Sequence, residues 1–321
     1  MIFVSNEQVR RYVGIEAIID AVEAAFAALG RGESALFPVT RGTGSDPRHF
    51  VAVKSGRDGS TGLIGAKIGS YNPGNRARGL PAHTSTTILI DDETAAVTAV
   101  VEADYLNGMR TAAADAVAAR RLAREDARIL GVIGIGNQAV FEVEALHAVR
   151  PIHRVLAARR SEASDARFAA CVRERTGLVV SFLSAQDVVS NSDIIATVTP
   201  AMSPVLCDAW VRPGTHIAAM GADNVGKWEL PVELVARSKL FVDDPEQAAV
   251  IGEAQHSIAS GLLSLEALRR RSLGALVNGA VEGRSDSSDI TIFDSSGIAV
   301  QDIAAAKAAV SILQQAGVIG Q

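Results

Sequence analysis

The segment ILGVIGIGNQAVFEVEALHAV, residues 129–149, places a glycine-rich turn between a short apolar run and a helical pattern. The first glycine of this turn permits a tight reversal, the second leaves the backbone open to a pyrophosphate, and the final alanine keeps the helix close to the sheet. Backbone N–H groups at the helix start would face phosphate. The segment therefore predicts a dinucleotide-binding GxGxxA turn, and a βα turn that merely requires glycines is the alternative. The turn residues expected at the cofactor are Gly134, Gly136, Asn137, Gln138 and Ala139.

The second apolar run, RVLAA at residues 154–158, should end beside the adenosine ribose. Users of NAD usually carry an acidic residue there, whereas this chain has Arg159, Arg160 and Ser161. A guanidinium pairs with a 2′-phosphate through two hydrogen bonds, and a carboxylate repels it. The sequence therefore favours NADP(H) over NAD(H), with two solvated arginines at a strand end as the alternative.

Short apolar runs alternate with helical stretches from about residue 128 onward, which is typical of an α/β Rossmann fold with a doubly wound parallel sheet. The first third of the chain differs. Residues 5–32 have the apolar spacing of a helix, and strand-like runs separated by Gly, Pro, Asn and Asp follow. We therefore expect an antiparallel sheet with a helix against it, an alanine-rich helix at 108–124, and a last helix in the C-terminal tail.

Composition excludes several classes of protein. Hydrophobic residues make up 48% of the 321 residues, enough for sizeable cores, and the net charge of −5 provides no basic surface for nucleic acid. No apolar run approaches the length of a membrane span, and the N-terminus lacks the features of a signal peptide. The two cysteines, Cys171 and Cys207, lie outside any CxxC motif. We expect a soluble, cytoplasmic protein without a metal site.

Five charged residues in strand-like or glycine-flanked segments are candidates for substrate chemistry. They are Arg41 in FPVTRG, Lys54 in VAVKSG, Lys67 in GAKIGS, Arg110 in NGMRTAA and Asp223 in MGADNVGK. Four cations and one loop carboxylate indicate an anionic substrate and one acid or base, because hydride transfer requires a substrate clamp and a proton donor or acceptor. Taken singly, each cation has the alternative of being an ordinary surface charge.

A set of motifs spread along the chain resembles one family. In order, they are FPVTR, GAKIGSYNP, YLNGMRTAAADAVAARRLAR, LGVIGIGNQA, PGTHIAAMGADNVGKWEL and DITIFDSSGIAVQDIA. Together they resemble the ornithine cyclodeaminase/mu-crystallin family over nearly the whole chain. The resemblance implies a Rossmann domain at residues 121–299. It also implies a homodimer whose second domain, residues 1–120 with 300–321, binds substrate and contributes antiparallel strands to a barrel shared by two subunits.

Individual residues match functional positions of that family. The resemblance implies that Arg41, Lys67 and Arg110 hold the substrate α-carboxylate and surround the reacting carbon, and that Asp223 transfers the proton. Lys67 and Asp223 are therefore the expected catalytic residues. Arg159 stands where NAD-using members carry Asp, which agrees with NADP(H). Further implied cofactor contacts are Thr84, Arg110, Thr111, Asn137, Gln138, Thr199, Met220, Gly221 and Ser295.

One departure from the family pattern bears on the substrate. Ornithine cyclodeaminases carry a Glu thirteen residues before the lysine matched by Lys67, and this chain has Lys54 there. A cation would repel the ornithine ammonium and attract a distal carboxylate. The segment GEAQHSIASGLL, residues 252–263, also resembles the iminosuccinate reductase branch. We therefore predict reduction of a small 2-imino acid, iminosuccinate to aspartate, with His83 either binding the distal carboxylate or serving as a structural histidine.

Other activities of the family are the alternatives. An ornithine cyclodeaminase would convert ornithine to proline and ammonia with recycled NAD, and a different ketimine reductase or an alanine dehydrogenase would act on another side chain. A non-enzymatic NADPH-binding protein resembling mu-crystallin is a third alternative. The intact set of cations and Asp223 argue against it, because a protonated iminium accepts hydride far better than a neutral imine and so needs an acid nearby.

Overall fold

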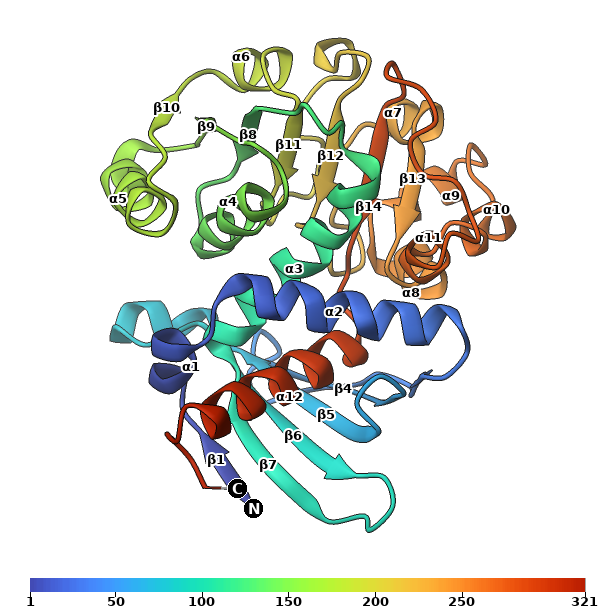
Figure 1. The fold of residues 1–321 in the computed structure, drawn as a ribbon. Helices are drawn as coiled ribbons and strands as arrows, with labels where there is room; N and C mark the ends of the chain where they lie inside the picture. Colours follow the sequence, from blue (N-terminus) through green and yellow to red (C-terminus); the bar gives the residue numbers. More distant parts are fainter. Residues whose placement is uncertain (321) are drawn as a thin grey trace. The chain divides into compact units, whose positions relative to one another are not determined.

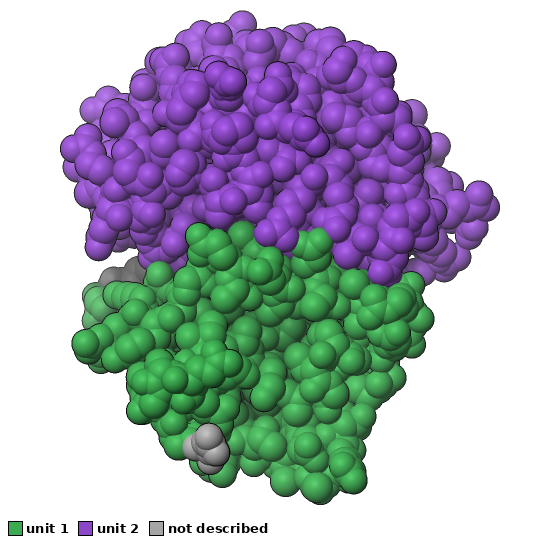
Figure 2. Space-filling model, viewed as in Figure 1, with its two compact units in different colours: residues 1–110, 298–321 green, residues 111–297 purple. Residues whose placement is uncertain are grey.

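The computed structural model describes residues 1–320, which form two compact units (Figure 2). Unit 1 contains Met1–Arg110 and Ile298–Gln321, and unit 2 contains Thr111–Gly297. Along the chain, unit 1 gives way to unit 2 between Arg110 and Thr111, inside helix α3 (Asp104–Leu122). The domain boundary expected from the sequence, at residue 120, lies in the same helix. Within residues 1–320, no helix combines the length and the apolar character that a membrane crossing needs.

A seven-stranded sheet forms the centre of unit 1, in the order β1-β7-β6-β5-β4-β2, with β3 paired to β4. Strand β1 runs parallel to β7, and the other pairs are antiparallel. The expected antiparallel sheet is therefore mixed, because residues 2–4 add a parallel edge strand. The strands are β1 (Ile2–Val4), β2 (Ala35–Leu36), β3 (Thr40–Thr43), β4 (Phe50–Asp58), β5 (Leu63–Tyr71), β6 (His83–Asp91) and β7 (Val97–Glu102).

Two long helices, α2 (Ile15–Gly30) and α12 (Ala299–Gln315), pack side by side in unit 1, and α12 lies against β4, β5 and β6 (Figure 1). The apolar spacing over residues 5–32 predicts one helix, but the structure has α1 (Asn6–Tyr12) and then α2. The break occurs because Val13 and Gly14 adopt extended backbone angles. A short 3-10 helix, η1 (Pro73–Arg78), separates β5 from β6.

Close approach of α12 to the sheet depends on a glycine in β5. A Cβ at Gly65 would lie 2.6 Å from Cγ1 of Ile303 in α12 and 3.0 Å from the carbonyl oxygen of Ile88 in β6. Only a residue without a side chain leaves room for α12 at this distance. Because Lys67 is two residues further along β5, it emerges on the same face of the sheet, beside α12.

The sheet of unit 2 is parallel throughout, in the order β10-β9-β8-β11-β12-β14-β13, which confirms the predicted doubly wound α/β arrangement. The order reverses between β8 and β11, and ligands bind at the carboxyl ends of strands flanking such a reversal. The strands are β8 (Ile129–Ile133), β9 (Arg154–Ala158), β10 (Val180–Phe182), β11 (Ile194–Thr197), β12 (His216–Ala219), β13 (Lys239–Val242) and β14 (Thr291–Asp294). Its helices are α4 (Asn137–Val149), α5 (Asp165–Thr176), α6 (Ala185–Ser190), α7 (Val232–Arg237), α8 (Pro245–Ile251), α9 (Ala254–Ala259), α10 (Leu265–Arg269) and α11 (Leu273–Val277), with 3-10 turns η2 (Glu162–Ser164) and η3 (Asp208–Trp210).

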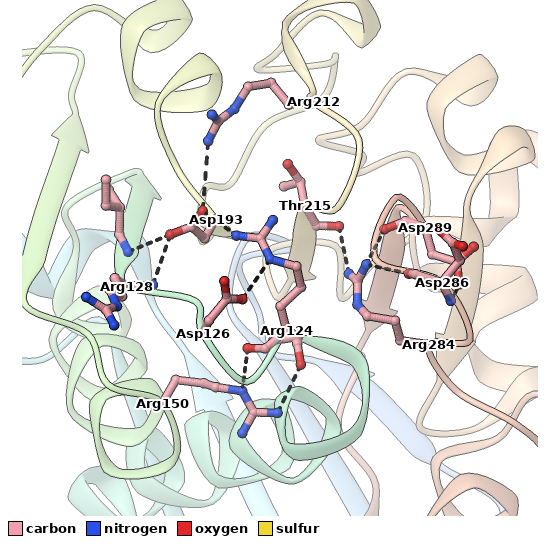
Figure 3. Close-up of polar contacts among 12 residues, drawn as sticks. Arg124, Asp126, Arg128, Arg150, Asp193, Arg212, Thr215, Arg284, Asp286 and Asp289 are labelled. Atoms are coloured by element: carbon pink, nitrogen blue, oxygen red, sulfur yellow. Dashed lines mark hydrogen bonds and ion pairs between the residues drawn. The ribbon is translucent and has the colours of Figure 1, made fainter.

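Arginines stabilise the C-terminal end of α3, where the last carbonyl groups of a helix lack partners within the helix. Arg150 donates to the carbonyl oxygen of Ala119 at 2.7 Å and to that of Arg124 at 3.0 Å. Figure 3 shows Arg150 beside Arg124. Arg284 donates to that of Leu122 at 2.7 Å. Nearby, one carboxylate oxygen of Asp193 accepts the backbone N–H groups that open β8. These bonds fix the path of the chain from α3 into the first strand of the parallel sheet.

Substituting Gly65 with alanine should destabilise unit 1. The new methyl group would collide with Ile303, and overpacking of this kind costs about 1–3 kcal/mol. Urea-induced unfolding measures the change. Gly42→Ala is the matched control in the same sheet, because a Cβ there meets nothing within 4 Å. Equal stability of the two variants would show that α12 tolerates displacement.

Candidate functional site

Cations from three neighbouring strands of unit 1 share one face of the sheet. Lys54 in β4 is directly opposite Lys67 in β5. Arg41 in β3 is opposite Ala52, which is two residues from Lys54 and therefore on the same face. The structure thus brings together three of the cations that the sequence identified. His83 also belongs to this face, because its ring lies within 3.6 Å of the position that a Cβ of Gly69 would occupy.

Helix α3 brings a fourth cation, Arg110, to Lys67. The Oδ1 atom of Asn107 accepts hydrogen bonds from both, at 2.9 Å from Lys67 Nζ and 2.7 Å from Arg110 Nη2. The start of α12 supplies a carboxylate to the same pair. Asp302 Oδ1 lies 3.0 Å from Lys67 Nζ and 2.8 Å from Arg110 Nε. Gln301 Oε1 accepts a further bond from Arg110 Nη1 at 3.0 Å.

Burial controls the charge of this cluster. Lys67 is 7% exposed and Asp302 is 3% exposed. Desolvation, followed by the charge of Arg110, lowers the pKa of Lys67 to about 7, although Asp302 acts in the opposite direction. Burial raises the pKa of Asp302, but Arg110 and Lys67 outweigh it, so that this pKa lies below its usual value. Asp302 is therefore ionised at neutral pH, and Lys67 titrates within the physiological range.

Thr84, a predicted cofactor contact in unit 1, does not join the cations. Its hydroxyl lies 2.9 Å from the hydroxyl of Ser70, its partner in β5. Side chains alternate along a strand, so Ser70 and Thr84 face the side of the sheet opposite to Lys67. Its role as a cofactor contact stays a prediction.

The glycine turn of unit 2 has the shape that a dinucleotide requires. Gly134 has φ +95°, and a Cβ there would lie 2.7 Å from Cγ2 of Thr199. Gly136 begins α4 without a side-chain cap, and a Cβ there would meet nothing within 4 Å. Ala139, in the first turn of α4, is fully buried. The open space over Gly136 and the N-terminus of α4, which has no side-chain cap, therefore fit a pyrophosphate.

Arg159, predicted to bind a 2′-phosphate, has protein partners. Its Nε lies 2.9 Å from Asp165 Oδ2, its Nη2 lies 3.1 Å from Glu162 Oε1, and its guanidinium lies over the ring of Phe182. Two carboxylates therefore neutralise this arginine, which weakens the interpretation made from its position in the sequence. Arg160 is exposed at the same strand end and so is the better placed of the two to meet a phosphate. Ser161 caps η2 by accepting the N–H of Ala163.

A buried glutamate that sequence reasoning missed joins two cofactor-side loops. Glu229 Oε1 accepts the N–H and the hydroxyl of Thr199, at 2.7 and 2.6 Å, and its Oε2 accepts the N–H of Gly221 at 2.9 Å. Burial raises the pKa of Glu229. Glu253 in turn accepts the backbone N–H of Glu229 at 2.6 Å. The loops after β11 and β12 are therefore held together at the carboxyl edge of the sheet. Met220, the first residue after β12, is buried.

The predicted proton-transfer residue is on an exposed part of the second of these loops. Asp223 Oδ1 lies 2.5 Å from Lys227 Nζ, and the carboxylate side chain is 58% exposed. Gln255, from the GEAQ segment, holds this loop by accepting the N–H of Gly226 at 2.8 Å and donating to the carbonyl of Lys227 at 2.9 Å. Lys227 was not among the predicted site residues.

The remaining predicted cofactor contacts lie in unit 2. Ser295 follows β14 and donates its hydroxyl to Asp243 at 3.0 Å. Gln138 donates to Glu142 at 2.7 Å, and Asn137 accepts from Arg167 at 2.5 Å. Thr111 is the next residue of α3 after Arg110. Sequence reasoning missed Asn107, Gln301 and Asp302, although the i, i+3 spacing of Asn107 and Arg110 on a helix was an available signal.

Comparison with known proteins gives consistent results. The model of the ornithine cyclodeaminase/mu-crystallin family matches residues 1–315. The chain is 36% identical over 318 residues to an iminosuccinate reductase of Paracoccus denitrificans, covering 99% of this chain and 98% of that protein. The crystal structure of the P. denitrificans enzyme in complex with NAD+ superimposes with a TM-score of 0.94, covering 100% of this chain and 98% of the other.

Two further relatives are similarly close. An alanine dehydrogenase of Archaeoglobus fulgidus is 35% identical over 311 residues, covering 95% of this chain and 93% of the relative. The structure of a Thermococcus litoralis Δ1-pyrroline-2-carboxylate reductase in complex with NADH and L-proline has 29% identity and a TM-score of 0.94, with 100% of both chains covered.

Substituting Gly136 with alanine should weaken dinucleotide binding without unfolding the protein. The methyl group would occupy the open space over the turn, and we expect an affinity loss of at least about tenfold. Fluorescence titration with NADH and NADPH measures the affinity. Gly134→Ala is the contrasting variant, and it should lower the melting temperature because of the positive φ and the contact with Thr199. Unchanged cofactor affinity in Gly136→Ala would contradict the placement of the pyrophosphate.

Proposed function

Because the chain belongs to the ornithine cyclodeaminase/mu-crystallin family, we propose that it is an NAD(P)H-dependent imine reductase that converts iminosuccinate to aspartate. Its similarity to an iminosuccinate reductase over 99% of its length supports this reaction. The similarities to an alanine dehydrogenase and to a Δ1-pyrroline-2-carboxylate reductase support the wider class of nicotinamide-dependent oxidoreductases.

The observation that carries the choice of substrate is the position of Lys54 directly across from Lys67. Arg41 shares their face of the sheet, and Arg110 reaches Lys67 through Asn107 and Asp302. Four cations and one buried carboxylate leave the cluster with a net positive charge, which favours a substrate that carries two negative charges. A diamino acid would place its distal ammonium among these cations and be repelled.

Each residue has one role in the proposed reaction. Lys67 and Arg110 bind the α-carboxylate, and Lys54, with Arg41 and His83 on the same face, binds the distal carboxylate. Asp223 delivers the proton to the imine nitrogen, because the iminium is the better hydride acceptor. A bound NAD(P)H supplies the hydride.

For the cofactor, we infer a preference for NADP(H), with NAD(H) as the alternative. No carboxylate stands at position 159, and Arg160 is exposed beside it. The neutralisation of Arg159 by Asp165 and Glu162 makes the preference depend on Arg160. The relatives with bound cofactor contain NAD+ or NADH, so the two cofactors must be compared directly.

We also propose that the protein is a homodimer whose subunits share a barrel. Val51 and Ile68 are 42% and 39% exposed on the sheet face opposite to Lys67. Exposed apolar side chains on two neighbouring strands of one sheet face favour a protein partner. A structure of an archaeal alanine dehydrogenase with bound NAD, 33% identical to this chain, is a dimer.

A screen of 2-keto acids with ammonia and either cofactor tests the function. Consumption of NAD(P)H with oxaloacetate, faster than with pyruvate, is the expected result. Release of ammonia from ornithine without net change in nicotinamide absorbance would instead identify a cyclodeaminase. Tight cofactor binding without turnover of any imine would identify a binding protein.

Lys54→Met should separate dicarboxylate from monocarboxylate substrates. Loss of one partner of a buried charge pair costs roughly 2–5 kcal/mol, so activity with oxaloacetate and ammonia should collapse, mainly through KM. Activity with pyruvate and ammonia should change little, because pyruvate has no distal charge. Lys54→Glu should abolish the dicarboxylate activity. An equal loss on both substrates in Lys54→Met would remove Lys54 from substrate recognition.

Arg160→Ser should alter cofactor preference. Removing a charge-assisted pair costs roughly 1.5–3 kcal/mol, so NADPH affinity should fall about tenfold to hundredfold while NADH affinity is kept. Equilibrium titration with each cofactor measures both. Arg159→Ser is the companion variant, which removes the arginine that pairs with Asp165 and Glu162. If Arg160→Ser weakens both cofactors equally, the 2′-phosphate assignment is wrong.

A further inference from the structure

Lys67 and Arg110 both contact the same two side chains, the amide of Asn107 and the carboxylate of Asp302, and this arrangement has a use in the proposed function. Asn107 Oδ1 accepts from Lys67 Nζ at 2.9 Å and from Arg110 Nη2 at 2.7 Å. Asp302 Oδ1 lies 3.0 Å from the same Nζ and 2.8 Å from Arg110 Nε. The acceptors come from α3 and α12, so the two cations are fixed from two sides.

The remaining hydrogens of the two cations can be counted. An ammonium has three N–H donors, and Asn107 and Asp302 face two of those of Lys67, which leaves one. A guanidinium has five. Gln301 and Asn107 accept one from Nη1 and one from Nη2 of Arg110, and Nε forms an ion pair with Asp302. When only partners among residues 1–320 are counted, Arg110 keeps one N–H group on Nη1 and one on Nη2 for a ligand. Three N–H groups thus match one carboxylate, which offers about four lone-pair sites.

We propose that Asp302 is a positioning residue for substrate binding, which, together with Asn107, aims the remaining N–H groups of Lys67 and Arg110 at the substrate α-carboxylate. The inference rests on the proposed function for the identity of the substrate. Asp302 itself does not contact the substrate. It acts through Lys67 and Arg110, which do. Asp302 reaches them because α12 lies close to β5 over Gly65.

Charge gives Asp302 a second effect. The groups that face Lys67 are Lys54 from β4, Arg110 from α3 and Asp302 from α12, and Arg41 from β3 lies on the same face. Asp302 is the one anion among them. Lys67 has a pKa of about 7, and Asp302 raises it against burial and the other cations. Only the protonated lysine attracts a carboxylate, so affinity should be full below this pKa and fall as the pH rises through it.

Three variants test the proposal. Asp302→Asn removes the charge and keeps the shape. Asn107→Asp adds a charge at the other shared acceptor. The double variant N107D/D302N exchanges the two groups, so that the site keeps one carboxylate and one amide, each still shared by Lys67 and Arg110. Asp92→Asn, at an exposed turn, is the control for loss of a carboxylate elsewhere in unit 1.

The measurement is calorimetric binding of succinate and, separately, pyruvate, between pH 6 and pH 9, with NADP+ or NAD+ at saturation. Asp302→Asn should weaken both ligands by at least about 30-fold and move the pH at which affinity falls to a lower value. Asn107→Asp should move that pH upward. The double variant should recover most of the affinity and the wild-type pH dependence, and Asp92→Asn should match the wild type.

Two results would overturn the proposal. One is an Asp302→Asn variant with wild-type affinity and an unchanged pH dependence. The other is a double variant that melts like the wild type yet binds as weakly as Asp302→Asn. Failure of the proposed function looks different, because wild-type protein would then bind pyruvate but not succinate while Asp302→Asn still weakened pyruvate.

Discussion

The carboxylate of Asp302 joins three segments that are far apart in the sequence. Lys67 comes from β5, Arg110 from α3, and Asp302 itself from the start of α12. All three side chains are less than a tenth exposed, so each charge has lost most of its hydration. Removing one partner from such a group leaves an uncompensated buried charge, which is strongly destabilising. The cluster therefore ties the start of α12 to β5 and α3 at a point where the loss of any one partner would be costly.

The same group connects stability to chemistry. A cluster of cations that is held rigidly before the ligand arrives loses little conformational freedom on binding. Asp302 and Asn107 achieve this without consuming all the donors of Lys67 and Arg110. In unit 2, Glu229 performs a comparable task with backbone groups, since it bonds to Thr199 and Gly221 at once. Buried acceptors thus hold the groups predicted to contact ligands in both units.

Local features of the chain were predictable from the sequence. The GxGxxA turn and the parallel sheet follow from periodicity and from residue types at short spacing, whereas a joint role for the cations came from the family resemblance. The contact of Asp302 with Lys67 does not, because no local pattern states which distant segments pack together. Arg159 illustrates another limit. Its position at a strand end indicated a phosphate, but Asp165, six residues later, supplies a carboxylate through a turn that the pattern does not specify.

The return of α12 to unit 1 has a consequence for how the protein is made. Unit 2 is an insertion within unit 1, since residues 111–297 separate the strands of unit 1 from α12. Domains tend to fold as units in the order of their synthesis. The cofactor-side unit is therefore complete while unit 1 still lacks its covering helix and the carboxylate that faces Lys67 and Arg110. The cluster of Lys67, Arg110 and Asp302 therefore cannot form until α12 has been synthesised, after the whole of unit 2.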